Sequence, residues 1–253
     1  MDNQGALVRA ASILSEARSV LLFTGAGISV ESGIPPFRGQ GGLWEVYDPA
    51  FIEIGHFLRH PETSWAKIRE IFYDHWGNAE PNPAHYALAD LQKAGRAGLL
   101  VTQNIDCLHQ RAGSPNVAEF HGTLEYLVCL ECGDRFKAAP ELTSQKLPSC
   151  PHCGGLLKPD VVFFGEGIPE QASSDSFDAA DHADAVLVVG TSGEVMPACL
   201  IPHRAKERGA KVVEVNPDPS AFSRGGITDV LLRGRAGTVL PELVKMILAD
   251  RNV

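Results

Sequence analysis

The sequence predicts an α/β protein with a Rossmann-like parallel sheet, helices on both faces, and a smaller module beside it. Unbroken apolar runs typical of strands buried on both faces recur along the chain, and helical segments separate them. Two C-x-x-C pairs and an aromatic-rich segment interrupt this alternation, and these interruptions predict the smaller module.

Five apolar runs are the expected strands of the sheet. The first is VLLFTG at 20–25, an unbroken run that ends in Gly. The others are GLLVTQN at 98–104, AVLVVGT at 185–191, KVVEVN at 211–216 and the weaker DVLLRG at 229–234. Runs of this kind are typical of a parallel sheet covered on both faces.

Helices are expected between these strands. The clearest covers 82–95, where Asn82 is the expected N-cap, Pro83 the first helical residue and Gly95 the residue past the end. In a later candidate, Pro202 must mark a break or a second start. The other helical candidates are 6–17, 196–210 and 237–250.

Four of the six cysteines form two C-x-x-C pairs. Cys129 and Cys132 are separated from Cys150 and Cys153 by 17 residues, which is a zinc-ribbon spacing. Four thiolates complete a tetrahedral site without an open position, so the expected Zn²⁺ is structural. The alternative is two redox pairs without metal. The two remaining cysteines are expected to be packing thiols: Cys107 and Cys199.

The length of 253 residues fits one large domain, or a domain that carries a smaller module. We expect one domain whose large part comprises 1–43, 82–121 and 158–253. The small module is expected to combine a helical insertion over 44–81 with a zinc ribbon over 122–157.

The formal net charge of −9, without a basic cluster, disfavours nucleic acid as a partner and is compatible with a cationic protein tail. No apolar run is long enough to cross a membrane. The first ten residues, MDNQGALVRA, lack the pattern of a signal peptide, so a cytoplasmic location is expected.

A glycine-rich stretch follows the first strand. Gly25, Ala26 and Gly27 would let backbone N–H groups face an anion without obstruction by side chains. The dinucleotide pattern G-x-G-x-x-G is incomplete because position 30 is Val. An ordinary strand–helix turn is the alternative to nucleotide binding.

Polar residues end three of the predicted strands, where open α/β sheets bind ligands. Gln103, Asn104 and Asp106 follow the second strand, although an Asn/Asp turn is the alternative for them. The motifs GTS at 190–192 and VNP at 215–217 end two others. Grouped along one sheet edge, these residues favour a binding site.

His121 lies in EFHGT, between an apolar run and Gly. A histidine there can act as a general base near neutral pH. A structural histidine is the alternative.

Taken together, these elements resemble sirtuins, the NAD-dependent protein deacylases. The resemblance extends from about residue 20 to 240. Its motifs are GAGISVESGIPPFRG, TQNIDCLHQRAG, EFHGT, the paired C-x-x-C motifs, KPDVVFFGE, GTSGEVMPA and VNP.

The resemblance implies a large NAD-binding part with NAD as cosubstrate. It places Gly25, Ala26 and Gly27 at the pyrophosphate, with Phe37 and Arg38 in a flap over the nicotinamide ribose. It places Gln103, Asn104 and Asp106 at the nicotinamide. It places Gly190, Thr191 and Ser192 at the phosphate and ribose, and Asn216 at the adenosine ribose. His121 would be the general base. The resemblance implies that Asn104 is a catalytic residue together with His121.

The resemblance also implies the substrate. Acetyl-lysine proteins or peptides would bind as an added strand on VVFFGE, with Val162 and Phe163 as walls of the acyl-lysine tunnel. Many relatives carry Leu where this chain has Gly193, so we expect a looser contact with the peptide there. Relatives that prefer succinyl-lysine carry Tyr-x-x-Arg where this chain has Arg69 and Phe72. We therefore expect neutral acyl groups, with Arg69 as a solvated surface residue.

Two other functions stay open at this point. One is mono-ADP-ribosyl transfer or NAD hydrolysis in the same pocket, and the other is a non-catalytic NAD or ADP-ribose sensor. The oligomeric state is not predicted by any feature of the sequence.

Overall fold

The computed structural model describes residues 3–37 and 41–249. Within them, six strands form one parallel sheet in the order β3-β2-β1-β7-β8-β9. These strands are β1 (Val20–Thr24), β2 (Leu100–Thr102), β3 (Val117–Glu119), β7 (Ala185–Val189), β8 (Lys211–Asn216) and β9 (Val230–Arg233). All five predicted strands are present. The strand β3 was not predicted, because its three residues, Val117–Glu119, are too few to show a strand pattern.

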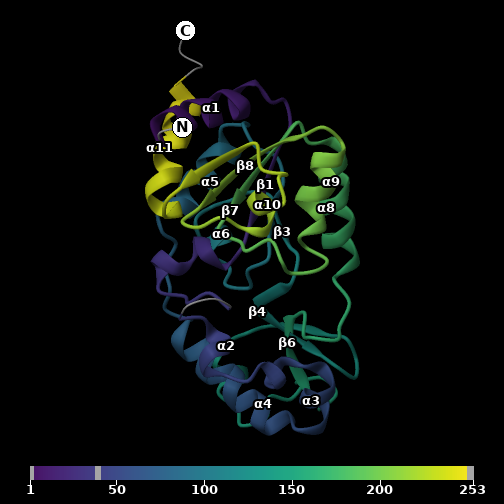
Figure 1. Cartoon of the computed structure of the whole chain (residues 1–253). Helices are drawn as coiled ribbons and strands as arrows, with labels where there is room; N and C mark the ends of the chain where they lie inside the picture. Colours follow the sequence, from purple (N-terminus) through teal and green to yellow (C-terminus); the bar gives the residue numbers. More distant parts are fainter. Residues whose placement is uncertain (1–2, 38–40, 250–253) are drawn as a thin grey trace.

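Helices cover both faces of the sheet, as predicted (Figure 1). One face packs against α1 (Asn3–Glu16), α5 (Pro83–Lys93) and α11 (Ala236–Ala249). The other face packs against α8 (Glu170–His182) and α9 (Leu200–Glu207). Helix α8 was not predicted, because its residues are mostly polar and small. No helix among the described residues is long and apolar enough to span a bilayer.

The caps predicted for α5 are confirmed. The Asn82 side chain accepts the Ala84 N–H at 2.9 Å, and the Asn82 N–H donates to His85 Nδ1 at 3.2 Å. Because α9 begins at Leu200, Pro202 lies in its first turn, where a missing N–H leaves no helical bond broken.

The small module has its own antiparallel sheet in the order β5-β4-β6. Its strands are β4 (Gly122–Cys129), β5 (Arg135–Lys137) and β6 (Leu157–Val161), with α7 (Pro140–Thr143) beside them. The segment 44–81 is mostly helical, as predicted. Its helices are α2 (Leu43–Val46), η3 (Pro49–Ile52), α3 (Ile54–Arg59), α4 (Pro61–Ile68) and the π-helix η4 (Arg69–His75). Both segments share one apolar core, whereas the division of the chain at the predicted boundaries stays a prediction.

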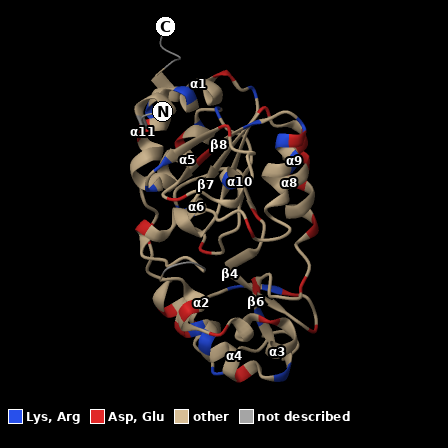
Figure 2. Ribbon diagram, in the orientation of Figure 1, with Lys and Arg blue, Asp and Glu red and all other residues tan. Residues whose placement is uncertain are grey.

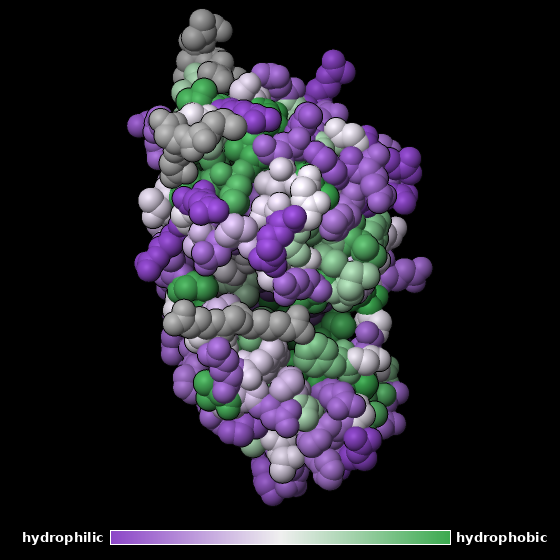
Figure 3. Space-filling view, viewed as in Figure 1, coloured by the Kyte–Doolittle hydropathy of each residue, from purple (hydrophilic) through white to green (hydrophobic). Residues whose placement is uncertain are grey.

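The surfaces of the two parts are mixed in charge, with acidic and basic residues interspersed (Figure 2). Apolar side chains gather on the surface where the sheet domain meets the small module (Figure 3). The exposed large apolar residues include Phe164, Met196 and Leu200. Apolar side chains are also visible elsewhere on the sheet domain, so this boundary is one of several apolar areas on this face (Figure 3).

Trp65 joins the helical insertion to the ribbon. Its side chain is 0% exposed, and its Nε1–H donates to the Leu157 carbonyl oxygen at 2.8 Å. The indole therefore fills the shared core and satisfies a buried carbonyl of β6.

We predict that Trp65→Phe lowers the free energy of unfolding by about 1–3 kcal/mol, because it leaves that carbonyl without a donor. Thermal unfolding followed by circular dichroism measures the effect. Trp44→Phe is the matched control, since the Trp44 indole is only half-buried and its nitrogen has no hydrogen-bond partner among the described residues. Equal melting temperatures for the two variants would contradict the prediction.

Candidate active site

The carboxyl ends of four strands meet at one edge of the sheet and carry most of the predicted site residues. Residues 25–27 follow β1, residues 103–106 follow β2, residues 190–192 follow β7, and Asn216 ends β8. The chain order reverses between β1 and β7, and open α/β sheets bind ligands in the crevice at such a point. The topology therefore brings these four segments together.

Two glycine loops pack backbone against backbone at this reversal. The Gly27 N–H donates to the Gly190 carbonyl oxygen at 2.7 Å, and the Gly25 N–H donates to Val189 O at 3.0 Å. A Cβ atom at Gly27 would lie 2.7 Å from Gly190 Cα, and one at Gly25 would lie 2.8 Å from Thr191 Cβ. The glycines are thus required for the approach of the two loops, whether or not an anion is bound.

Ser29, Asn104 and Asp106 form a hydrogen-bonded cluster beside the glycine loop. Ser29 Oγ donates to Asp106 Oδ2 at 2.7 Å, and Asn104 Nδ2 donates to Ser29 Oγ at 3.1 Å. Burial raises the pKa of the Asp106 carboxyl, against hydrogen bonds from the Leu108 N–H, Ser29 and Asn104. Asn104 Oδ1 is buried and has no partner among the described residues, so it can accept from a ligand.

Ser29 was not predicted to be a site residue, although it ends the GAGIS motif. Two buried histidines behind the cluster were not predicted either. His85 Nε2 lies 3.4 Å from Ser29 Oγ, and His109 Nε2 lies 3.0 Å from Thr24 Oγ1. Burial lowers the pKa of His85 to about 4 and lowers the pKa of His109 well below its usual value. Both rings are therefore neutral at pH 7.

Thr191 connects the β2 and β8 sides of the crevice. Its Oγ1 accepts from Gln103 Nε2 at 3.1 Å, and its carbonyl oxygen accepts from Asn216 Nδ2 at 2.9 Å. The side chains expected at the two ends of the cosubstrate are thus joined through one residue.

The structure explains why a glycine stands at position 193. Its φ is +75°, and a Cβ atom there would lie 3.0 Å from the Phe222 ring. The neighbouring Ser192 carbonyl accepts from the Ala221 N–H at 2.7 Å, which holds the two loops together. A branched side chain at position 193 would separate them.

Phe37 packs against the small module. Its ring centroid lies 5.4 Å from that of Trp44 and 5.7 Å from that of Trp76. Arg38, the other expected residue of the flap, lies outside the described residues. The aromatic contacts place the start of the flap at the boundary between the two parts.

His121 lies between β3 and β4 with one ring nitrogen engaged. Its Nδ1 is 3.0 Å from the Gln103 carbonyl oxygen, which can only accept, so Nδ1 carries the proton. Nε2 therefore keeps its lone pair. Burial lowers the pKa of His121 from 6.5, against the bond to Gln103, which raises it. The ring is neutral at pH 7 and has the form that a general base requires.

Phe163, expected to wall the acyl-lysine tunnel, is only 1% exposed. Its ring packs edge-on against Phe57 with centroids 5.3 Å apart, and Lys158 Nζ lies 4.2 Å from its centroid. Phe163 therefore presents no surface to a ligand in this structure. Phe164 is 45% exposed and is the aromatic side chain that this loop offers, beside the half-buried Val162.

In the same loop, few main-chain N–H and carbonyl groups are free to bind a peptide. Lys158 Nζ donates to Glu166 Oε2 at 3.0 Å, and the same carboxylate oxygen accepts the Phe163 N–H at 2.7 Å. The N–H groups engaged within the protein are those of Val162, Phe163 and Phe164. Among the described residues, the N–H and carbonyl of Gly165 have no hydrogen-bond partner. The Val162 carbonyl also has no partner among these residues, so an added strand would pair with the main chain at Val162 and Gly165 and not along the whole of VVFFGE.

The four paired cysteines converge as predicted. All four sulfurs lie within 4.8 Å of one another, with Cys129 and Cys153 Sγ 3.5 Å apart and Cys132 and Cys150 Sγ 3.7 Å apart. Tetrahedral Zn²⁺ with Zn–S bonds of about 2.3 Å requires S···S distances of about 3.8 Å. The thiols fit a structural zinc ion.

The other two cysteines lie apart from this cluster. Cys107 Sγ lies 3.1 Å from Thr123 Oγ1, and burial raises the pKa of its thiol to about 11. Cys199 is buried, and burial raises its pKa as well. Both are protonated at pH 7, which agrees with packing roles.

We predict one Zn²⁺ per chain, measured by plasma emission on protein purified without added metal. Cys132→Ser should lose the metal and unfold the ribbon, since a segment of this size has little core of its own. Cys107→Ser is the matched control and should keep the metal. Substoichiometric zinc in active wild-type protein would refute the site.

Comparison with known proteins agrees with this geometry. A model of the Sir2 family matches residues 25–197. An NAD-dependent protein deacylase of Thermococcus kodakarensis is 46% identical, over 97% of this chain and 98% of that protein. The crystal structure of a Sir2 homolog–NAD complex has a TM-score of 0.88 at 38% identity, covering 96% of this chain and 94% of the other. A Sir2 variant with a deacetylated p53 peptide and 3′-O-acetyl ADP-ribose has a TM-score of 0.87 at 32% identity, covering 98% and 99%. This chain therefore belongs to the Sir2 family.

Proposed function

We propose that this protein removes acetyl and other neutral acyl groups from protein lysines with NAD as cosubstrate. The products would be deacylated lysine, nicotinamide and O-acyl-ADP-ribose. The observation that carries the proposal is His121, whose Nε2 lone pair is available at the sheet edge where the glycine loops and the Asp106 cluster meet. The names of the relatives and the molecules bound in them support the same reaction.

The crevice has the chemistry to hold NAD. Its nicotinamide end would lie at Asp106 and at Asn104 Oδ1, two acceptors suited to a carboxamide N–H₂. The expected contacts with the pyrophosphate, phosphate and ribose are Gly25, Ala26, Gly27, Gly190, Thr191, Ser192 and Asn216. Bound NAD supplies the ADP-ribose that accepts the acyl group. Phe37, backed by Trp44 and Trp76, would exclude water from the reacting sugar.

His121 would take a proton from a ribose hydroxyl. Because its Nδ1–H donates to the Gln103 carbonyl, the ring is fixed with Nε2 as the basic atom. Its lowered pKa keeps that atom unprotonated at pH 7. The lysine substrate would pair with the free main chain at Val162 and Gly165, and Phe164 would contact it.

We predict that His121→Ala reduces turnover by about 10²–10⁴-fold while NAD binding survives, because a general base is not needed to hold the cosubstrate. In the wild type, the acid limb of kcat/KM should lie below pH 6.5, since the pKa of His121 is lowered from that value. Steady-state kinetics across pH and calorimetric titration with NAD test both expectations.

His182→Ala is the matched control, because that ring is exposed on α8. It should leave turnover and the pH profile unchanged. Near-normal turnover of His121→Ala would remove His121 from the role of base.

The reaction type is decided by mass spectrometry of the products from NAD and an acetyl-lysine peptide. Deacylation gives O-acetyl-ADP-ribose in a 1:1 ratio to deacetylated peptide. Free ADP-ribose without deacetylation would indicate NAD hydrolysis, and a peptide gaining ADP-ribose would indicate transfer. Either result would overturn the proposal, as would the absence of any product.

Whether the acyl pocket accepts a charged acyl group depends on Arg69 and Phe72, the residues in place of Tyr-x-x-Arg. Arg69 is not the solvated residue that we expected. It is half-buried, its Nε donates to the Thr143 carbonyl at 2.6 Å, and its Nη2 donates to the Gln145 carbonyl. Phe72 is 2% exposed within the aromatic core. The guanidinium is thus committed to the ribbon, and neither residue supplies a free cation.

We predict that kcat/KM on an acetyl-lysine peptide exceeds that on the matched succinyl-lysine peptide by at least a few hundred-fold. A buried carboxylate without a partner costs about 3–5 kcal/mol, and about 1.4 kcal/mol is tenfold. Arg69→Gln should leave this ratio unchanged. Comparable activity on both peptides, or a ratio that shifts in Arg69→Gln, would show that a cation reaches the acyl group.

A further inference from the structure

Glu214 is a fully buried carboxylate on β8 that none of the roles above uses. It is 0% exposed, and three donors face it. Asn216 Nδ2 and the Ser220 N–H donate to its Oε1 at 2.9 and 3.3 Å, and Thr228 Oγ1 donates to its Oε2 at 2.7 Å. Among the described residues, it pairs with no Lys or Arg. The carboxyl group is therefore held by hydrogen bonds alone.

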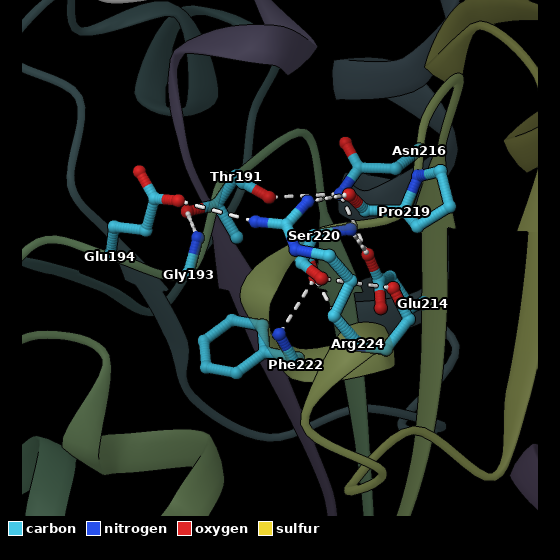
Figure 4. Close-up of polar contacts among 10 residues, drawn as sticks. Thr191, Gly193, Glu194, Glu214, Asn216, Pro219, Ser220, Phe222 and Arg224 are labelled. Atoms are coloured by element: carbon cyan, nitrogen blue, oxygen red, sulfur yellow. Dashed lines mark hydrogen bonds and ion pairs between the residues drawn. The ribbon is translucent and has the colours of Figure 1, made fainter.

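These bonds fix the orientation of the Asn216 amide (Figure 4). Asn216 Nδ2 donates both to Glu214 Oε1 and to the Thr191 carbonyl oxygen, each at 2.9 Å. Both amide hydrogens are used, and a flipped amide would set Oδ1 against two acceptors. Asn216 Oδ1 has no partner among the described residues. It is left to accept from a ligand in the crevice.

The position of Asn216 indicates which half of NAD it meets. The reversal between β1 and β7 separates the β2 side, which carries His121 and Asp106, from the β8 side. For His121 to act as general base, the nicotinamide ribose must lie beside it on the β2 side. The adenosine, at the other end of NAD, then lies over β8. The hydroxyl groups of the adenosine ribose are the donors that a neutral amide oxygen at this place would accept from.

Glu214 also orders the loop that follows β8. Besides the Ser220 N–H, it holds Thr228 from the far end of this loop. Ser220 caps α10 (Ala221–Arg224), and the Ala221 N–H donates to the Ser192 carbonyl at 2.7 Å. One buried carboxylate thus connects the β7 loop, the amide of Asn216 and the loop 217–228.

We propose that Glu214 is a positioning residue for the adenosine half of NAD: it sets Asn216 so that Oδ1 accepts a hydrogen bond from the adenosine ribose. This inference rests on the proposed NAD-dependent function for its ligand. It depends on no step of the deacylation.

The test compares Glu214→Gln with wild type, using calorimetric titration with ADP and with 2′,3′-dideoxyadenosine diphosphate. Gln replaces one of the two acceptor oxygens by an N–H₂ group and leaves the other as a weaker, neutral acceptor, so the hold on Asn216 is weakened. We expect ADP affinity to fall by about tenfold. The analogue, which has no ribose hydroxyls, should lose less than twofold. In steady state, the KM for NAD should rise while kcat and the KM for peptide change little.

Two further variants separate positioning from a general structural effect. Asn216→Ala should reproduce the selective loss of ADP affinity, and Glu214→Gln should add nothing in that background. Glu194→Gln is the control, because that exposed carboxylate pairs with Arg224 across the same loops and should leave both affinities unchanged. If Glu214→Gln does not fold, Thr228→Val removes one of the three donors and should give a smaller loss, again confined to ADP.

Equal losses for ADP and for the dideoxy analogue, or no loss for either, would overturn the assignment. The assignment would also be overturned if Glu214→Gln lowered ADP affinity further in the Asn216→Ala background. The titrations need no turnover. A wild-type protein that binds ADP but releases no O-acetyl-ADP-ribose would therefore refute the proposed function without deciding the role of Glu214.

Discussion

The contact between the glycine loops at Gly27 and Gly190 is the constraint on which the rest of the site depends. The two backbones approach so closely that a Cβ atom at Gly27 would lie 2.7 Å from Gly190 Cα. This contact fixes the carboxyl end of β1 against that of β7, where the strand order reverses. Open α/β sheets bind ligands at such a reversal, and here His121 lies on the β2 side and Asn216 on the β8 side.

The small module is connected to His121 through the chain itself. β4 (Gly122–Cys129) begins next to His121 and ends at a cysteine of the metal cluster. β6 (Leu157–Val161) leads back to Val162, whose N–H donates to the His121 carbonyl at 2.8 Å. A structural zinc ion would therefore hold in place the two strands that flank His121 without contacting that residue.

Local features of the fold could be predicted because neighbouring residues decide them. Unbroken apolar runs revealed the buried strands, Asn82 and Pro83 revealed the start of α5, and the spacing of two C-x-x-C pairs predicted four converging thiols. The polar residues that end separate strands were expected to meet because parallel strands place their carboxyl ends at one edge. Short or polar elements such as β3 and α8 have no such local signal, and they were missed.

The sequence by itself thus determined the fold class, the metal ligands and the edge of the sheet that forms the crevice. Only the tertiary structure decided which atoms are available there. The tautomer of His121 depends on the carbonyl of Gln103, and the burial of Phe163 in place of Phe164 depends on Phe57 and Lys158. Ser29 and Asp106 meet across 77 positions of sequence. Such choices follow from contacts between distant segments, which set burial and hydrogen-bond partners in ways that no local pattern records.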